Sequence, residues 1–207
     1  MNFNGAMRDQ AMNADADFPS SPELMSRGDT ALLVVDVQEK LVPRIAGARR
    51  VVWNVRRLID GAAILGLPVE ATEQYPQGLG PTVAELAQRL GPIPAKLTFS
   101  CLGCGEIFTR WQQRGLHRIL VCGIETHVCV QQTVLDLLSQ GWRVYVAVDA
   151  TGSRRRIDYR TALHRMDAAG AVLTTTEAAL FEWCREAGTP EFRRISQLVK
   201  EDPPEEL

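Results

Sequence analysis

The stretch Ile119-Leu120-Val121-Cys122-Gly123-Ile124-Glu125-Thr126-His127-Val128-Cys129-Val130 decides the fold of this 207-residue chain. Its apolar start predicts a buried strand, and Gly123 marks the tight turn that follows. A helical pattern of apolar residues then begins at Val130 and ends at Gly141. A strand, a turn and a helix in this order are typical of one unit of a parallel sheet.

Cys129 falls in the first turn of this predicted helix. Free main-chain N–H groups at the start of a helix favour an anion and lower the pKa of a thiol. Because a thiolate is a nucleophile and a thiol mostly is not, the position predicts a reactive cysteine. A cysteine on a helix is also commonly a small core residue, so this alternative stays open.

The same alternation of short apolar segments and amphipathic helices runs through the chain. Strands are expected at residues 31–37, 68–72, 95–99, 118–123, 143–148 and 171–174. Helices are expected at residues 50–65, 83–90, 107–114, 130–140, 159–169 and 176–187, with a loop at 74–81. Six such units predict a three-layer α/β/α fold with a doubly wound, six-stranded, mostly parallel sheet. We expect this domain to span residues 28–200, between a flexible N-terminal arm at 1–27 and an acidic tail at 201–207.

The composition narrows the class of protein. Hydrophobic residues make up 45% of the chain and charged residues 23%, which suits one globular domain with a full core. The net charge of −2 argues against nucleic acid as the main partner, and no apolar run is long enough to span a membrane. The N-terminus lacks the apolar segment of a secretory signal, so we expect a cytoplasmic location and five free thiols. Cys101 and Cys104 form at most half of a metal site or a redox pair.

Three polar residues fall at the predicted carboxyl ends of strands, where chemistry collects in such sheets. Asp36 ends the first strand, Lys96 lies on the third, and Cys129 follows the fourth. Taken singly, Asp36 is better explained as an N-cap or structural anchor, and Lys96 as an exposed edge residue. Together they form a nucleophilic set, in which the carboxylate takes a proton, the ammonium stabilises negative charge and the thiolate attacks.

These positions also carry a resemblance to a known family. The chain resembles the isochorismatase-like cysteine hydrolase superfamily in Asp36-Val37-Gln38, in Lys96 and in the elbow formed by Gly123, Thr126, Cys129 and Val130. The resemblance covers residues 29–198. It is closest to the branch of isochorismatase-domain-containing hydrolases of unsettled substrate, through segments 36–41, 72–76, 78–82, 174–177 and 192–196.

The resemblance implies a role for each residue. Cys129 is the expected nucleophile, Asp36 the general base and Lys96 the cation between them. A cis peptide bond is implied between Ile124 and Glu125, with the N–H groups of Glu125 and Cys129 forming an oxyanion hole. Gln38, Tyr75, Phe99 and Thr126 are the candidate substrate contacts, although a core position is the competing interpretation for Phe99.

The implied activity is hydrolysis of a small amide, carbamoyl or related C–N substrate through a thioester. The resemblance implies no cofactor, and it implies assembly into a homo-oligomer, a dimer or larger. Related nicotinamidases bind a metal after the second strand, but residues 72–76 here contain no histidine, so no metal is expected. The alternative is a regulatory or assembly module on a hydrolase fold, with Cys129 as a redox-sensing or vestigial thiol.

Overall fold

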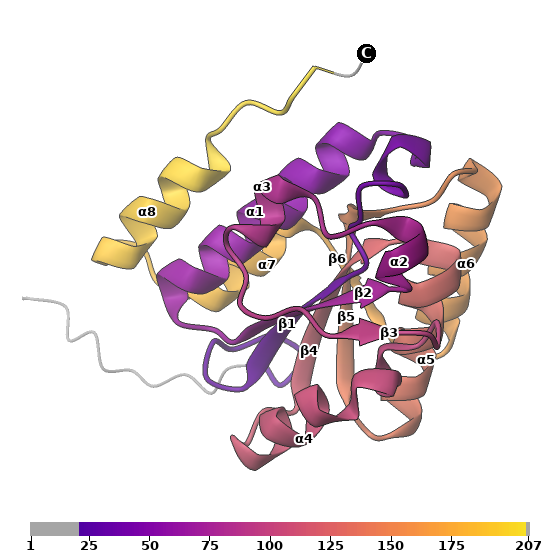
Figure 1. The fold of residues 1–207 in the computed structure, drawn as a ribbon. Helices are drawn as coiled ribbons and strands as arrows, with labels where there is room; N and C mark the ends of the chain where they lie inside the picture. Colours follow the sequence, from indigo (N-terminus) through magenta and orange to yellow (C-terminus); the bar gives the residue numbers. More distant parts are fainter. Residues whose placement is uncertain (1–20, 206–207) are drawn as a thin grey trace, which may run out of the picture.

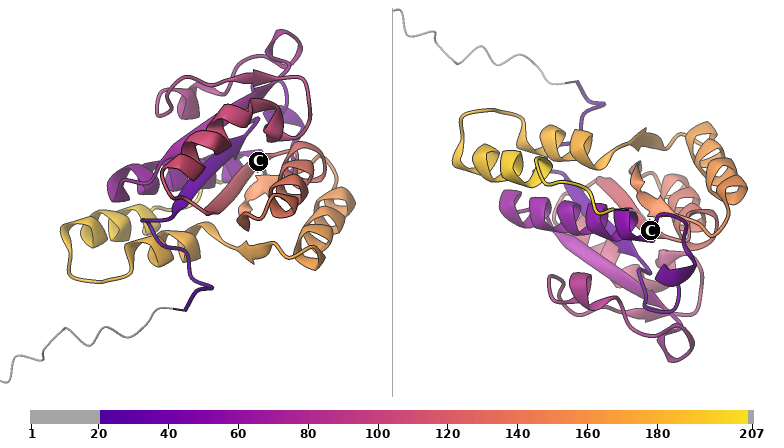
Figure 2. Two further views of the ribbon diagram at one scale, coloured as in Figure 1. Left: turned by 90° about the horizontal axis from the view of Figure 1, so that it is seen from below. Right: turned by 90° about the horizontal axis from the view of Figure 1, so that it is seen from above.

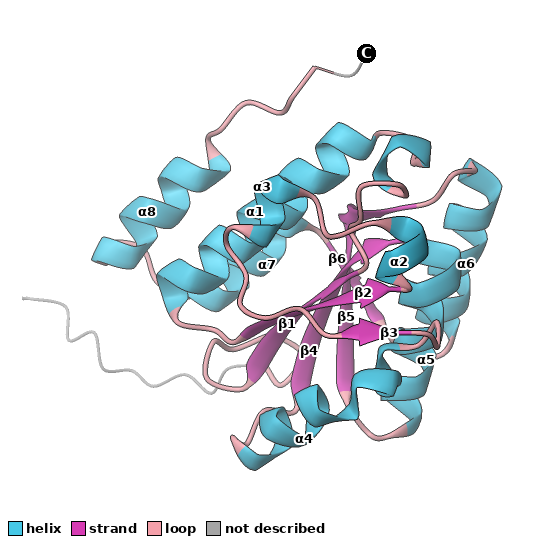
Figure 3. Cartoon of the chain, in the orientation of Figure 1, coloured by secondary structure: helices cyan, strands magenta, loops and turns pink. Residues whose placement is uncertain are grey.

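The computed structural model describes residues 21–205, and its centre is a sheet in which every strand pair is parallel (Figures 1 and 3). The strand order is β3-β2-β1-β4-β5-β6. The strands are β1 Thr30–Val35, β2 Val69–Gln74, β3 Ala95–Lys96, β4 Arg118–Ile124, β5 Arg143–Gly152 and β6 Val172–Thr174. The predicted doubly wound α/β fold is therefore confirmed, and the sheet is wholly rather than mostly parallel.

Helices cover both faces of this sheet (Figure 2). One face carries α1 Ala48–Leu65, α7 Thr176–Cys184 and α8 Pro190–Val199; the other carries α4 Gly105–Gln113, α5 Gln131–Ser139 and α6 Arg156–Ala168. The short helices lie in the connections: η1 Val42–Arg44, α2 Pro76–Leu79, α3 Ala84–Ala87, η2 Cys101–Cys104 and the π-helical turn η3 Thr126–Val130. Within residues 21–205 no helix has the length and hydropathy needed to cross a bilayer.

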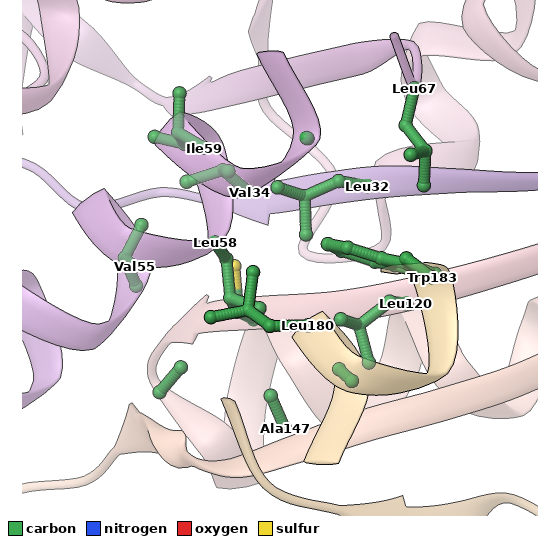
Figure 4. Close-up of a cluster of buried hydrophobic side chains, with 14 of the residues drawn as sticks. Leu32, Val34, Val55, Leu58, Ile59, Leu67, Leu120, Ala147, Leu180 and Trp183 are labelled. Atoms are coloured by element: carbon green, nitrogen blue, oxygen red, sulfur yellow. The ribbon is translucent and has the colours of Figure 1, made fainter. Parts of the chain in front are cut away.

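Strand alternation divides the core into two apolar clusters. On β1, Leu32 and Val34 pack under α1 and α7 with Leu58, Leu180 and Trp183 (Figure 4). The other face of β1 packs against α4 and α5. Each large side chain buried in this way contributes roughly 1.5–3 kcal/mol of transfer free energy, so β1 is held firmly from both sides.

Some expected elements are shorter than the sequence predicts. The predicted strand 95–99 is reduced to Ala95–Lys96 because the chain then turns, and the carbonyl groups of Thr98 and Phe99 accept hydrogen bonds from Lys96 Nζ. The predicted helix 83–90 has a single turn, Ala84–Ala87. The expected loop 74–81 contains the short helix α2.

The C-terminal helical region is divided in two. The predicted helix 176–187 stops at Cys184, and Arg185 takes a φ of 64°. A second helix that the sequence analysis did not predict, α8, begins at Pro190, where Thr189 Oγ1 accepts a hydrogen bond from Phe192 N at 3.0 Å. In the expected acidic tail, Glu201 forms an ion pair with Arg56 on α1.

The predicted flexible arm, residues 1–27, lies mostly outside the described residues. Its described end is held against the domain, which corrects the expectation for residues 21–27. The Met25 side chain is fully buried, and Met25 N donates a hydrogen bond to Glu182 Oε2 at 2.9 Å. The hydroxyl of Tyr145 donates to Glu23 O at 2.8 Å. This end of the arm therefore belongs to the packed domain.

Gly123 lies where β4 passes β1, with no room for a side chain. Its φ is +116°, and an added Cβ would lie 2.1 Å from Val35 O. We expect Gly123→Ala to lower the free energy of unfolding by roughly 3 kcal/mol or more, measured by urea unfolding. Gly66→Ala is the control, because its φ is +77° but its added Cβ meets no atom within 4 Å; the expected cost there is about 1 kcal/mol. If both variants lower the free energy of unfolding equally, the close approach of β1 to Gly123 does not cause the loss.

Candidate active site

The three candidate catalytic residues come together at the carboxyl edge of the sheet. Asp36 directly follows β1 with a φ of 51°, Lys96 ends β3, and Cys129 lies in η3 after β4. In the sheet, β1 lies between β2 and β4, so the strand order reverses at β1. The carboxyl end of β1 is therefore the switch point of the sheet. The fold thus brings together three buried residues that are distant in sequence.

The Asp36 carboxylate is the centre of the cluster. Lys96 Nζ lies 2.7 Å from Asp36 Oδ2, and both side chains are fully buried. The hydroxyl of Thr72 donates to Asp36 Oδ1 at 2.8 Å. The Cys129 thiol lies close enough to this carboxylate for each group to shift the pKa of the other. The base and the cation predicted from the sequence are therefore in direct contact, and the predicted nucleophile interacts electrostatically with the base.

The Lys96 ammonium is surrounded by oxygen atoms. Besides Asp36 it donates to Gln74 Oε1 at 2.8 Å and to Phe99 O at 3.0 Å, with Thr98 O at 3.3 Å. An ammonium has three N–H groups, so these acceptors satisfy it. Lys96 consequently fixes Asp36 and the loop after β3, and it offers no free N–H to another molecule.

Burial and charge set the protonation states of the cluster. Burial raises the pKa of Asp36, an effect that the Lys96 charge partly offsets. Burial lowers the pKa of Lys96, but the Asp36 carboxylate together with Cys101 and Cys129 outweighs this effect, so the net pKa is raised and the ammonium stays charged. Burial and the Asp36 charge raise the pKa of the Cys129 thiol above its ordinary value. The sequence-based prediction of a lowered thiol pKa is therefore wrong for the resting site, because desolvation outweighs the helix start.

Three buried thiols make stability depend on pH. Burial raises the pKa of Cys101 from 9.0 to about 11 and also raises the pKa of Cys122 and of Cys129. Above pH 9 the unfolded chain releases these protons and the folded protein keeps them, so the free energy of unfolding should fall as pH rises. Each thiol adds at most about 1.4 kcal/mol per pH unit, measurable by urea unfolding between about pH 8 and 10. Cys122→Ala should flatten the slope; an unchanged slope would contradict this assignment.

The elbow before Cys129 is tied to the loop after β5. The peptide bond between Ile124 and Glu125, where the resemblance implies a cis bond, is cis. Glu125 Oε2 accepts hydrogen bonds from Arg154 N at 3.0 Å and Arg154 Nε at 3.1 Å. The His127 ring contacts Ser153 Oγ at 3.0 Å. Nothing in the sequence pattern signalled this link, which joins two segments 26–29 residues apart.

The four candidate substrate contacts have different environments. Gln38 is fully buried, and its amide accepts from Gln74 N at 2.8 Å and donates to Gln74 O and Gly80 O. It therefore joins β1 to β2, and we expect it to shape the site rather than touch substrate. Tyr75 and Phe99 are each 50% exposed, so the core interpretation of Phe99 is wrong. The buried hydroxyl of Thr126 has no hydrogen-bond partner within residues 21–205.

Sequence reasoning missed two polar groups of the cluster, Thr72 and Cys101. The Cys101 thiol lies 3.3 Å from Thr72 Oγ1, and Cys101 N donates to Thr133 Oγ1 at 2.9 Å. Gln74, a third polar residue near the cluster, accepts from Lys96 Nζ. The strand period offered a signal, because residues 72 and 74 share one face of β2. Among the described residues, no group of three or more His, Cys, Asp or Glu side chains is arranged to hold a metal ion.

Comparisons of the sequence and of the structure with known proteins point to the same family. Residues 30–178 match the model of the isochorismatase domain. Isochorismatase domain-containing protein 2 of Pongo abelii is 42% identical over 181 residues, which is 86% of each chain. The structure of MAR1 ribonuclease from Caenorhabditis elegans is similar with a TM-score of 0.81 and 38% identity, over 88% of this chain and 95% of that one. The ycaC gene product of Escherichia coli, an octameric hydrolase of unknown specificity, has a TM-score of 0.72 and 25% identity, over 86% and 96% of the two chains.

Proposed function

The chain belongs to the isochorismatase-like family, and from this premise we propose that it is a cysteine hydrolase of a small amide, carbamoyl or related C–N substrate. One observation carries the proposal: the buried Asp36 carboxylate pairs with the Lys96 ammonium at 2.7 Å and lies close enough to the Cys129 thiol for each to shift the pKa of the other. This is the arrangement that a nucleophile, its base and a charge-balancing cation require.

The proposed reaction has two steps. Asp36 takes the thiol proton of Cys129 as sulfur attacks the substrate carbonyl carbon, and the N–H groups of Glu125 and Cys129 stabilise the oxyanion. The C–N bond breaks, and the amine leaves with the proton from Asp36. Water, deprotonated by Asp36, then attacks the thioester and releases the acid and the free thiol. Atoms and protons balance over the cycle, and Lys96 stays charged throughout.

The raised pKa values fit this mechanism. A general base works best when its pKa lies near the working pH, and burial moves that of Asp36 upward from its usual value. A thiol that is protonated at rest avoids a second negative charge beside the carboxylate. The thiolate would then form only when Asp36 accepts its proton in the reaction.

The substrate would enter beside Tyr75, which follows β2 next to Lys96, and Phe99, which lies in the turn after Lys96. Tyr75 N donates to Lys96 O at 2.9 Å, and Phe99 O accepts from Lys96 Nζ. Leu97, the residue after Lys96, is 76% exposed. An exposed apolar group of this kind suits contact with a second copy of the chain, and the octameric state of the E. coli protein supports a homo-oligomer.

Two other functions remain to be separated from this one. The C. elegans protein carries the name ribonuclease, and in this chain Arg154, the first of three consecutive arginines, is bonded to Glu125 of the elbow. A regulatory module with a redox-sensing Cys129 is the other. The test is to offer small primary amides, carbamoyl compounds and RNA in parallel, quench with acid during turnover and measure the intact mass. A mass increase equal to the acyl group, mapped to Cys129, supports the proposal; RNA cleavage without an adduct, or no turnover at all, contradicts it.

A further inference from the structure

Two side chains of β2 each contact a different member of the buried ion pair. Thr72 Oγ1 donates to Asp36 Oδ1 at 2.8 Å, and Gln74 Oε1 accepts from Lys96 Nζ at 2.8 Å. Thr72 is 1% exposed and Gln74 is 7% exposed, so water does not compete for these bonds. Polar groups this deeply placed contribute to charge states as well as to shape.

The register of the sheet explains why both residues reach the pair. Val35, just before Asp36, pairs with Thr72, while Gln74 pairs with Lys96. Residues two apart on a strand face the same side, so β2 presents both polar groups to the gap between β1 and β3. Gln38 fixes this register by bonding to both the N–H and the carbonyl of Gln74.

The hydroxyl of Thr72 has one proton, which goes to Asp36. Its other neighbour, the Cys101 sulfur at 3.3 Å, must then donate a thiol proton to the Thr72 oxygen. Burial raises the pKa of Cys101 to about 11, which agrees with a protonated thiol there. The series of hydrogen bonds runs from Cys101 to Thr72 and from Thr72 to Asp36. It ends on the Asp36 carboxylate and therefore favours the charged form of that group.

Gln74 offers Lys96 a neutral oxygen. Its Nε2 donates to Leu97 O at 2.8 Å, which fixes the amide with the oxygen toward the ammonium. A carboxylate at this position would share Lys96 with Asp36 and add a second negative charge. Two carboxylates that share one cation raise the pKa of at least one of them.

We propose that Thr72 and Gln74 are positioning residues that keep Asp36 ionised and aimed at Cys129. Thr72 supplies a hydrogen bond to the carboxylate, and Gln74 leaves the Lys96 charge to Asp36 alone. The inference rests on the proposed roles of Asp36 as base and Cys129 as nucleophile. Neither Thr72 nor Gln74 touches the reacting atoms in this scheme.

The test measures the reactivity of Cys129 without any substrate. The whole protein is alkylated with iodoacetamide across a range of pH, and the rate is read by mass spectrometry at Cys129. The acid limb of this pH–rate profile should report protonation of Asp36, because the Cys129 thiol can transfer its proton only to the ionised carboxylate. In Thr72→Val the midpoint should rise by about one pH unit, since a hydrogen bond to the charged form is lost. Thr72→Ser should keep the wild-type midpoint.

Gln74→Glu should also raise the midpoint, by about one pH unit or more, because it adds a like charge beside the pair. Thr151→Val is the matched control. Thr151 is a buried threonine on β5, and its hydroxyl bonds to Val148 O instead of a carboxylate. It should leave the midpoint unchanged. If Thr72→Val fails to fold, Thr72→Ala removes the same hydroxyl and should raise the midpoint equally, while Gln74→Glu tests the second contact.

The outcomes separate this inference from the proposed function. A midpoint that stays at the wild-type value in Thr72→Val and Gln74→Glu, even with a lower overall rate, overturns the positioning roles, provided that Asp36→Asn removes the acid limb. If Asp36→Asn leaves the limb in place, the role of Asp36 as base fails instead. A shift in Thr72→Val that Thr72→Ser does not restore points to a packing effect and also overturns the inference.

Discussion

Replacing Cys129 with alanine is expected to lower kcat by at least about 10⁴-fold on any small amide that the protein hydrolyses. The reason is that the thiol is the group that bonds to the substrate carbon, and Asp36 cannot replace it without a different geometry. The acyl adduct seen by intact mass after acid quench should disappear at the same time. The free energy of unfolding should change little, because alanine removes one buried sulfur atom.

Cys122→Ala is the control for this variant. Cys122 is also a fully buried thiol, but it packs in the cluster under α1 rather than beside Asp36. It should keep kcat within a small factor of wild type. Wild-type turnover in Cys129→Ala would exclude a thioester mechanism. A protein that never turns over but whose Cys129 is oxidised selectively would favour the regulatory alternative.

Replacing Lys96 with methionine should lower the free energy of unfolding by about 3–5 kcal/mol and abolish turnover. The side chain of Asp36 is fully buried, so the variant would leave its charge without a cation. The carboxylate would then take up a proton, and a protonated Asp36 could not deprotonate Cys129. Urea unfolding near neutral pH measures the first effect, and the amide assay measures the second.

A double variant and a control variant test whether the ion pair itself accounts for these effects. Asp36→Asn combined with Lys96→Met removes both charges and should recover much of the lost stability without recovering activity. Lys40→Met controls for loss of a lysine, because Lys40 donates to Gly78 O at an exposed site; it should cost about 0.5 kcal/mol or less. A similar cost for Lys96→Met and Lys40→Met would mean that the Asp36 charge is not supported by Lys96.

The fold was predictable because its signals are local. Uniformly apolar strands and amphipathic helices, each ended by glycine, predicted the parallel sheet and its position in the chain. Boundaries failed where long-range contacts decide them: β3 ends at Lys96 because the following carbonyls turn to reach its ammonium. The end of α7 at Cys184 was not predictable in this way, but the start of α8 was missed although Gly188, Thr189 and Pro190 form a helix stop and start signal.

The sequence predicted which residues form the candidate site, but it did not predict their protonation states and supporting contacts. Strand ends and the family resemblance brought Asp36, Lys96 and Cys129 together. The protonation of Cys129 was mispredicted because the pKa depends on desolvation, which a sequence does not display. The contributions of Thr72 and Gln74 depend on the register between β1, β2 and β3, and that register is a property of the assembled sheet.

The surroundings of Lys96 resemble the coordination sphere of a metal ion. Four oxygen atoms converge on a single charged atom, from the segment after β1, from β2 and from the turn after β3. A centre of this kind holds three segments in one geometry, as a structural ion does, but it is covalently part of the chain. A chelator cannot remove it, and no cellular supply limits its occupancy. Ordering of these three segments is therefore coupled to folding itself.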